Sequence, residues 1–368
     1  MAKKRSSRIV KSNEQVEINK MPEDMMVEIL SRLPVKTLVT LRSVCELWKS
    51  YISHPHFANL QIARNMTNPE FYDFFIAHCY DEGRRWPYKP SQHKLYVINK
   101  KNIHKPMALD LPLPSCSEPN RFSVVGSCNG LLCLAYFGSR KKKRQHRIYL
   151  WNPVTRQHKD VCMRKQNLQH RVSLGFGFDD ASRDYKIVSV LTDRFDFVSR
   201  VSVYSLGQDC WNRIDHAEMK ARVLQQCAVI VKGLFYWLME EKSDPRRFGF
   251  VWFNVQTEEL GTTSLPDGIS CPSVFELKGS VAISTGYIIN HEIGIWKQDD
   301  RGWIKIHAIK NSGITGFYGC LNTGEFVGGT YYGIALCDPA NKVIKYSNNL
   351  PRGILRAYNY SASLVKLN

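Results

Sequence analysis

The sequence predicts an α+β protein of two parts: three helices near its start, then an all-β, propeller-like domain of about six irregular blades. Apolar residues recur at helical spacing within residues 21–58, whereas short apolar runs bounded by turn residues recur from about residue 65 onward. The second pattern repeats every 41–53 residues, which is close to the length of one propeller blade. A chain of 368 residues has room for two such domains.

The helical segment is delimited by prolines. Pro22 suits the first position of a helix, where its missing N–H costs nothing. Pro34 ends that helix because the residue before a proline avoids the helical conformation. A second helix follows, and Pro55 breaks the pattern again. The apolar stripes are Met26, Ile29, Leu30 and Leu33 in the first helix, and Leu38, Leu41, Val44, Cys45 and Trp48 in the second.

These helices carry more apolar surface than a segment of about 40 residues can bury by itself. The segment holds one cysteine and no cluster of metal-binding side chains, so a disulfide or a metal does not compensate. Two interpretations stay open at this point. The apolar face docks onto a groove or helix of a partner protein, or it packs on the domain that follows in the same chain.

The order and spacing of these residues resemble the F-box, the motif that binds the Skp-family adaptor of SCF ubiquitin ligases. Met21 and Glu46 depart from the usual leucine and lysine of that family without removing an apolar anchor. The resemblance implies that the adaptor binds here and that it connects the chain to the cullin and RING subunits of the ligase. The matching residues are Pro22, residues 28–30, residues 32–34, Lys36, Leu38, Arg42, Val44, Cys45, Trp48 and residues 55–57.

The same resemblance assigns the adaptor-binding residues. They are Pro22, Ile29, Leu30, Leu33, Pro34, Val35, Leu38, Leu41, Val44, Cys45 and Trp48. We expect Leu30, Leu33, Pro34, Leu38, Leu41 and Trp48 to be the buried anchors of that interface.

Each repeat of the β domain contains an apolar strand that ends at a marker residue, usually Asn or Asp. Such a side chain bonds to its own backbone two residues on and leads the strand into a turn. A second apolar run precedes each marker by about one hairpin, so each repeat supplies three or four strands. Stacked in a ring, such units cover one another's faces and leave few free edges. The markers are Asn99, Asn152, Ser205, Asn254, Lys297 and Asp338, of which Ser205 and Lys297 depart from the rule.

A β-sandwich with evenly spaced strands is the alternative to the propeller. The two differ at the chain ends, since a propeller must join its first and last strands to avoid bare sheet edges. We expect residues 71–76 to pair with residues 360–367 within one blade.

Six blocks of the β domain resemble the plant F-box-associated domain, a kelch-like interaction domain that follows the F-box. In that family the β domain recruits the protein to be ubiquitylated. The predicted organisation is a basic, disordered tail at 1–20, an F-box at 21–64 and the propeller-like domain at 65–368. The blocks are residues 126–134, 150–156, 175–188, 203–211, 233–238 and 295–303.

Composition limits the compartment and the class of partner. The longest apolar run, residues 131–137, is far too short to span a membrane, and the basic start of the chain lacks the apolar core of a secretory signal. The eleven cysteines form no Cys-x-x-Cys pair, which indicates reduced thiols and a location in the nucleus, the cytoplasm or both. The net charge of +18 includes the basic run 140–147. Such a run favours either a solvated loop or, in the alternative function, a nucleic-acid-binding β-repeat protein.

No pattern predicts catalysis, a metal or a cofactor. Gly126-Ser127-Cys128-Asn129-Gly130 has the spacing of a nucleophile elbow, but that motif needs a helix after it, and a strand-like run follows here. The sequence therefore predicts a non-catalytic, substrate-recognition subunit of an SCF-type ubiquitin ligase. A protein target is expected on the β domain, and the sequence assigns no residue to it. Nucleic acid and membranes are not expected as partners.

Overall fold

The fold is taken from a computed structural model. It describes residues 21–67, 74–81, 92–112, 122–136, 146–163, 170–193, 198–241, 244, 247–269, 272–285, 292–310, 313–350 and 353–367. The predicted tail at 1–20 and most of the basic run 140–147 lie outside these residues.

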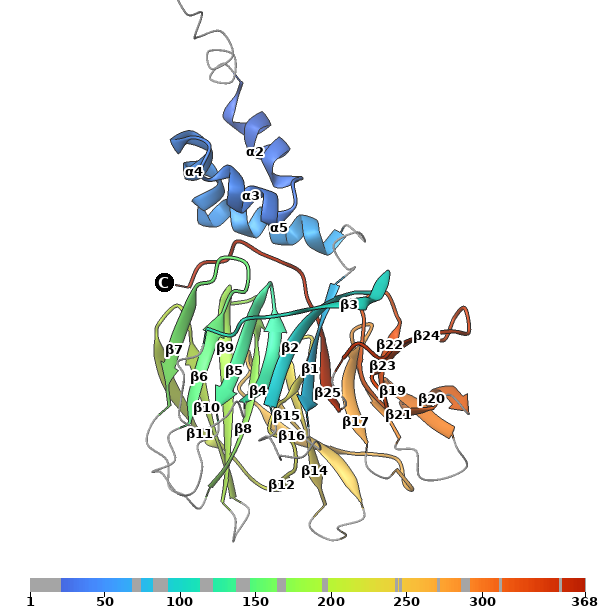
Figure 1. Ribbon diagram of the computed structural model, residues 1–368. Helices are drawn as coiled ribbons and strands as arrows, with labels where there is room; N and C mark the ends of the chain where they lie inside the picture. Colours follow the sequence, from blue (N-terminus) through green and yellow to red (C-terminus); the bar gives the residue numbers. More distant parts are fainter. Residues whose placement is uncertain are drawn as a thin grey trace, which may run out of the picture.

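Within the described residues the N-terminal part consists of four helices rather than three. They are α2 (Glu23–Ser31), α3 (Val35–Leu41), α4 (Glu46–Ser53) and α5 (Pro55–Thr67). Pro22 and Pro34 stand immediately before α2 and α3, so each separates one helix from the chain before it. Pro55 interrupts the helical pattern as expected, since α4 ends at Ser53 and His54 is extended, and it also begins α5, because a proline is tolerated in the first turn. Figure 1 shows the four helices above one end of the β domain.

The β domain is a six-bladed propeller, as the repeat predicted, and not a sandwich. Blade 1 has the strand order β25 (Ile354–Asn359), β1 (Phe74–Asp81), β2 (Gln92–Asn99) and β3 (Asn102–Ala108). Blade 2 contains β4 (Phe122–Cys128), β5 (Leu131–Tyr136), β6 (Arg147–Trp151) and β7 (His158–Cys162). Blade 3 contains β8 (His170–Asp179), β9 (Asp184–Asp193), β10 (Val198–Ser205) and β11 (Cys210–Lys220).

The other three blades follow the same plan. Blade 4 contains β12 (Arg222–Val223) and β13 (Val229–Val231), which both pair with β14 (Leu234–Glu240), and then β15 (Phe248–Asn254) and β16 (Leu260–Ser264). Blade 5 contains β17 (Ser273–Leu277), β18 (Ser280–Ser284), β19 (Glu292–Asp299) and β20 (Gly302–Lys310). Blade 6 contains β21 (Ile314–Cys320), β22 (Phe326–Thr330), β23 (Ile334–Asp338) and β24 (Val343–Ser347).

The core of the propeller lies between blades. Six clusters of buried apolar side chains occur in it, and each combines residues of two neighbouring blades. The cluster of blades 1 and 2, for example, joins Ile76 and Leu95 to Leu132 and Trp151. The first strands of the six blades, β25, β4, β8, β13, β17 and β21, contact one another around the ring. A single blade therefore buries its faces only when both neighbours are in place.

The ring is closed by the two ends of the β domain, as expected, but through a different strand. β25 pairs antiparallel with β1, and Ile76 faces Tyr358 in that register. The expectation that residues 360–367 form this strand is wrong, since they form no strand at all. Asn359 ends β25, because its side chain accepts a hydrogen bond from the Asn322 N–H and donates one to the Cys320 carbonyl. The expected pairing also involved residues 71–76, of which residues 71–73 lie outside the described residues.

The marker residues end the third strand of each blade. Asn99, Asn152, Asn254 and Asp338 accept hydrogen bonds from backbone N–H groups two residues on, and Ser205 does so three residues on through its hydroxyl. Lys297 is wrong as the marker of blade 5. Asp299, two residues later, accepts from the Arg301 N–H at 2.9 Å, so in each of the six blades a residue at the end of the third strand accepts a hydrogen bond from a nearby backbone N–H.

Candidate functional site

The four helices enclose a small core of their own. It is formed by Met26, Leu30, Val35, Leu38, Ile52, Phe57 and Ala58, together with Leu364 from the end of the chain. Leu30, Val35 and Leu38 of the predicted adaptor-binding set are thus buried inside the protein, at 2%, 3% and 0% exposure. In this conformation they support the helices from within, and their side chains do not reach the surface.

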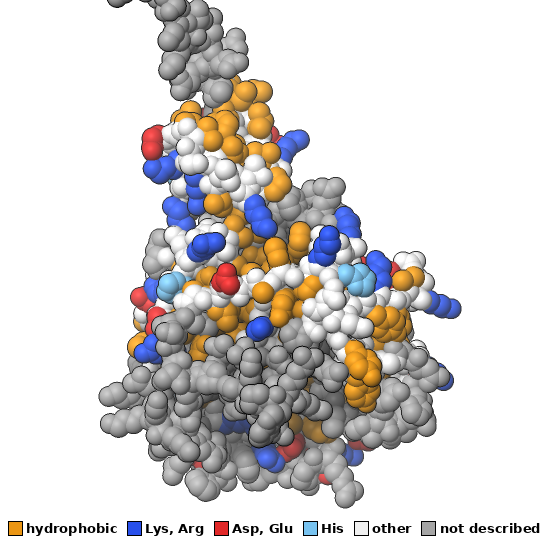
Figure 2. All heavy atoms as spheres, in the orientation of Figure 1, with side chains coloured by type: hydrophobic (Ala, Val, Ile, Leu, Met, Phe, Trp, Pro, Cys, Tyr) orange, Lys and Arg blue, Asp and Glu red, His pale blue; other side chains and the backbone are white. Residues whose placement is uncertain are grey.

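Other members of the predicted set form the outer surface of the helices. Ile29 is 48% exposed and Val44 is 60% exposed, so both side chains reach solvent. Pro22, Pro34 and Cys45 are exposed as well, and Leu33, Leu41 and Trp48 are half-buried against the core. Figure 2 shows hydrophobic side chains gathered on the helical part, with charged side chains beside them.

The sequence interpretation missed three exposed apolar residues of this surface. Met25 is 55% exposed, and Met21 and Leu47 are exposed too. A signal for Met25 was present, because Pro22, Met25 and Ile29 follow one another at three and four residues and so share one side of α2. We call Met21, Met25, Ile29, Val44 and Leu47 the apolar helical surface.

One carboxylate fastens α2 to α5. The Glu28 carboxylate accepts hydrogen bonds from Arg32, one turn further along α2, and from Arg64 on α5. These bonds, that to Arg32 first, hold the pKa of Glu28 below its ordinary value. Arg64 also donates to the Glu28 backbone carbonyl at 3.4 Å.

The last described residues of the chain join the helices to the propeller. Residues 360–367, which we call the strap, cross the propeller end that faces the helices (Figure 1). Asn65 of α5 donates to the Ala362 carbonyl at 3.2 Å, and Leu364 lies in the helical core at 1% exposure. The strap is therefore held from the helical side by a hydrogen bond and by apolar burial.

Blade 2 holds the strap from the other side. The Asn152 amide, fully buried, donates to the carbonyls of Ser363 at 3.1 Å and Val365 at 2.9 Å. Gly130 has φ +77°, and Ser363 lies so close to it that a Cβ would overlap the serine. A residue with a side chain at position 130 would thus push the strap away, in addition to its backbone strain.

Asn152→Ala should lower the free energy of unfolding by about 2 kcal/mol more than Asn254→Ala, measured by urea denaturation. Both residues cap the same turn in their own blades, with bonds to the backbone two and three residues on. Only Asn152 also bonds the strap, so the difference isolates the strap contacts. Equal losses in the two variants would show that the strap bonds add nothing.

The Gly126-Ser127-Cys128-Asn129-Gly130 motif forms a hairpin and not a nucleophile elbow. It comprises the end of β4 and a tight turn into β5, with Asn129 and Gly130 both at positive φ. Burial raises the pKa of the Cys128 thiol to about 12, which disfavours the thiolate form a nucleophile requires. This segment shapes the propeller end that faces the helices.

None of the helices in the described part of the chain is long and apolar enough to cross a membrane. Among the described residues, no three His, Cys, Asp or Glu side chains are grouped so that they could hold a metal ion.

Comparisons with known proteins agree with both parts of the architecture. A model of the F-box domain matches residues 18–60, and a model of the F-box associated beta propeller domain matches residues 90–281. The chain is similar to the F-box protein At3g16210 of Arabidopsis thaliana, with 29% identity over 251 residues, covering 67% of this chain and 61% of that protein. It therefore spans less than two thirds of that relative's length.

Two further likenesses differ in strength. The F-box/kelch-repeat protein At3g23880 of Arabidopsis thaliana is 23% identical over 317 residues, which is 81% of each chain. Among solved structures, TolB from Acinetobacter baumannii matches with a TM-score of 0.46 at 10% identity, covering 83% of this chain and 71% of TolB.

Proposed function

The chain belongs to the F-box associated beta propeller family and carries an F-box in front of its propeller, and we propose that it is a substrate-recognition subunit of an SCF-type ubiquitin ligase. The observation that carries this proposal is the apolar helical surface, exposed on helices that are otherwise well packed. Apolar side chains left on helices in this way are typical of a surface that docks a partner. The occupant we propose is a Skp-family adaptor, which links the chain to cullin and RING subunits.

The proposed adaptor-binding residues divide into three groups by their exposure to solvent. Leu30, Val35 and Leu38 hold the helices together, while the exposed Pro22, Ile29, Pro34, Val44 and Cys45 meet the adaptor, with the half-buried Leu33, Leu41 and Trp48 between them. Met21, Met25 and Leu47 extend the contact. Apolar side chains at the centre of an interface supply most of its binding energy.

In this proposal the chain performs no chemistry of its own. The propeller binds a protein target, and ubiquitin transfer takes place on other subunits of the ligase. The strap fixes the propeller to the helices, so a bound target is held at a defined place beside the ubiquitin carrier. Holding two reactants together raises their effective concentration and replaces a bimolecular encounter. We propose that the chain acts in the nucleus, the cytoplasm or both.

Affinity capture from plant cells tests the function. The bait is the wild-type chain or a docking variant carrying Ile29→Asp and Val44→Asp, which keeps the propeller and disables the apolar helical surface. A true target should accumulate with the docking variant and turn over faster when the wild-type chain is expressed. If no protein changes its lifetime between the two baits, the chain is not a degradation receptor.

A further inference from the structure

The propeller has a cavity on its axis that none of the roles above uses. Its volume is about 380 Å³, and the first strands of all six blades contribute to its walls. It lies toward the end of the ring that faces the helices, because its lining includes Ser127, Asn322 and Asn359 at that end of their strands or turns. Cavities of this size hold drug-sized organic ligands in other proteins.

The charged side chains of the lining are two cations, Lys232 and Arg356, and one carboxylate, Glu276. The Arg356 guanidinium donates to the carbonyls of Cys227 at 2.9 Å and Ala228 at 3.2 Å, which fixes its position across the channel. No carboxylate of the described residues pairs with Arg356 or with Lys232 at the rim. The one acidic residue of the lining, Glu276, accepts a hydrogen bond from the Gly279 N–H at 2.6 Å.

A third cation strengthens this imbalance at the rim. Lys278 occupies the turn between β17 and β18, and the end of its side chain lies over the next turn beside Gly324. The Lys232 side chain reaches the neighbouring turn at Gly279 in the same way. The two lysines thus lie at the rim of the channel in neighbouring blades. Their positive potentials add, and the low-dielectric walls of the cavity strengthen the sum.

The rest of the wall is apolar. Val229 and Ile230 of blade 4 and Tyr318 of blade 6 line the same space with side chains that are only half-buried. We propose that the axial cavity binds a small organic anion, with its apolar body against these side chains and its negative group beside Lys232 at the rim. This inference does not depend on adaptor docking, so either can fail without the other.

The position of the site connects it to the helices. A second cavity of about 230 Å³ lies between α5, the strap and blade 2, and it shares Ser127, Asn322 and Asn359 with the axial cavity. Ile62 and Asn65 of α5 line this second cavity. The two cavities therefore adjoin at these three residues, and the second one reaches α5.

A pair of fluorescent probes tests the proposal on the full chain. 8-Anilinonaphthalene-1-sulfonate carries an apolar body and a sulfonate, and N-phenyl-1-naphthylamine has the same body without the charge. We expect the sulfonate to bind at one saturable site per chain and more tightly than the neutral probe. Lys232→Gln should weaken sulfonate binding about fivefold to tenfold and leave the neutral probe unchanged.

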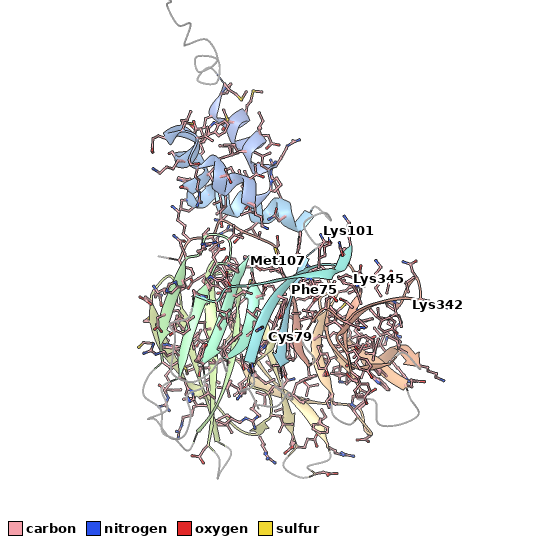
Figure 3. All side chains as sticks on the ribbon, viewed as in Figure 1. Phe75, Cys79, Lys101, Met107, Lys342 and Lys345 are labelled. Atoms are coloured by element: carbon pink, nitrogen blue, oxygen red, sulfur yellow. The ribbon has the colours of Figure 1, made fainter. Side chains whose placement is uncertain are left out.

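Two further variants complete the test. Lys342→Gln removes an exposed positive charge from the turn before the outer strand β24, where Figure 3 labels it, and should leave both probes unchanged. Val229→Trp fills the cavity from β13 and should abolish binding of both while the circular dichroism spectrum is retained. Sulfonate binding that Lys232→Gln does not weaken, or that equals binding of the neutral probe, would overturn the proposal.

Discussion

The docking variant, with Ile29→Asp and Val44→Asp, should lose at least about a hundredfold in affinity for a Skp-family adaptor. Both side chains are about half exposed or more in the free chain, so the protein tolerates polar atoms there. In the complex with the adaptor, water is excluded from these two positions, and burying a carboxylate without a partner costs free energy. Isothermal titration calorimetry with the purified adaptor measures the loss directly.

A matched variant controls for the added charge. Met107→Asp and Ile304→Asp place two aspartates on the outer strands β3 and β20 of the propeller, at residues 51% and 44% exposed, and Met107 is labelled in Figure 3. This variant should bind the adaptor like the wild-type chain. Equal binding by the docking variant and its control would mean that the apolar helical surface is not the adaptor interface.

Removal of the C-terminal segment should strongly lower the stability of the propeller. Two truncations separate the contribution of β25 from that of the strap. Removing residues 354–368 deletes both β25 and the strap. Blade 1 then loses its first strand, and the inner contacts of β25 with β4 and β21 go with it. We expect the propeller to lose most of a stability of about 5–15 kcal/mol and to melt without a cooperative transition.

Removing only residues 361–368 should leave the ring closed by β1 and β25. The helices lose the Asn65–Ala362 hydrogen bond and Leu364, and blades 2 and 3 lose the bonds of Asn152 and the packing of Leu367. Hydrogen exchange should then rise in the helices and in blades 2 and 3, and stay unchanged in the blades that do not contact the strap. If the short truncation unfolds the propeller as fully as the long one, the strap and not β25 closes the ring.

The repeat in the sequence was the most reliable guide to the fold. Asn152, Asn254 and Asp338 end their strands because a local side-chain bond starts the next turn, and local bonds can be read from local sequence. The same logic explains the error in blade 5. The third strand of blade 5 runs two residues past Lys297, and Asp299 makes the hydrogen bond that starts the turn. The sequence repeat placed the strand end at Lys297 and gave no sign of these two extra residues.

Features that depend on distant contacts could not be read in this way. Residues 360–367 alternate between polar and apolar side chains, as a strand does. Their carbonyl groups instead accept hydrogen bonds from the side chains of Asn65 and Asn152, which are far away in sequence. Likewise Leu30 shares an apolar stripe with Ile29, and Leu38 shares one with Val44. Which of them are enclosed depends on how the four helices pack with Leu364. The pattern predicted an apolar surface without showing which side chains compose it.

The most direct test of the proposed function is the salt dependence of adaptor binding by the wild-type chain. An apolar helical interface should keep its affinity within about threefold between about 0.1 M and about 0.5 M salt, because few charges are neutralised in it. Nucleic-acid binding by this chain of net charge +18 would instead fall by orders of magnitude over that range. A one-to-one complex that persists at high salt is the predicted result. No adaptor binding at either salt concentration would contradict the assignment.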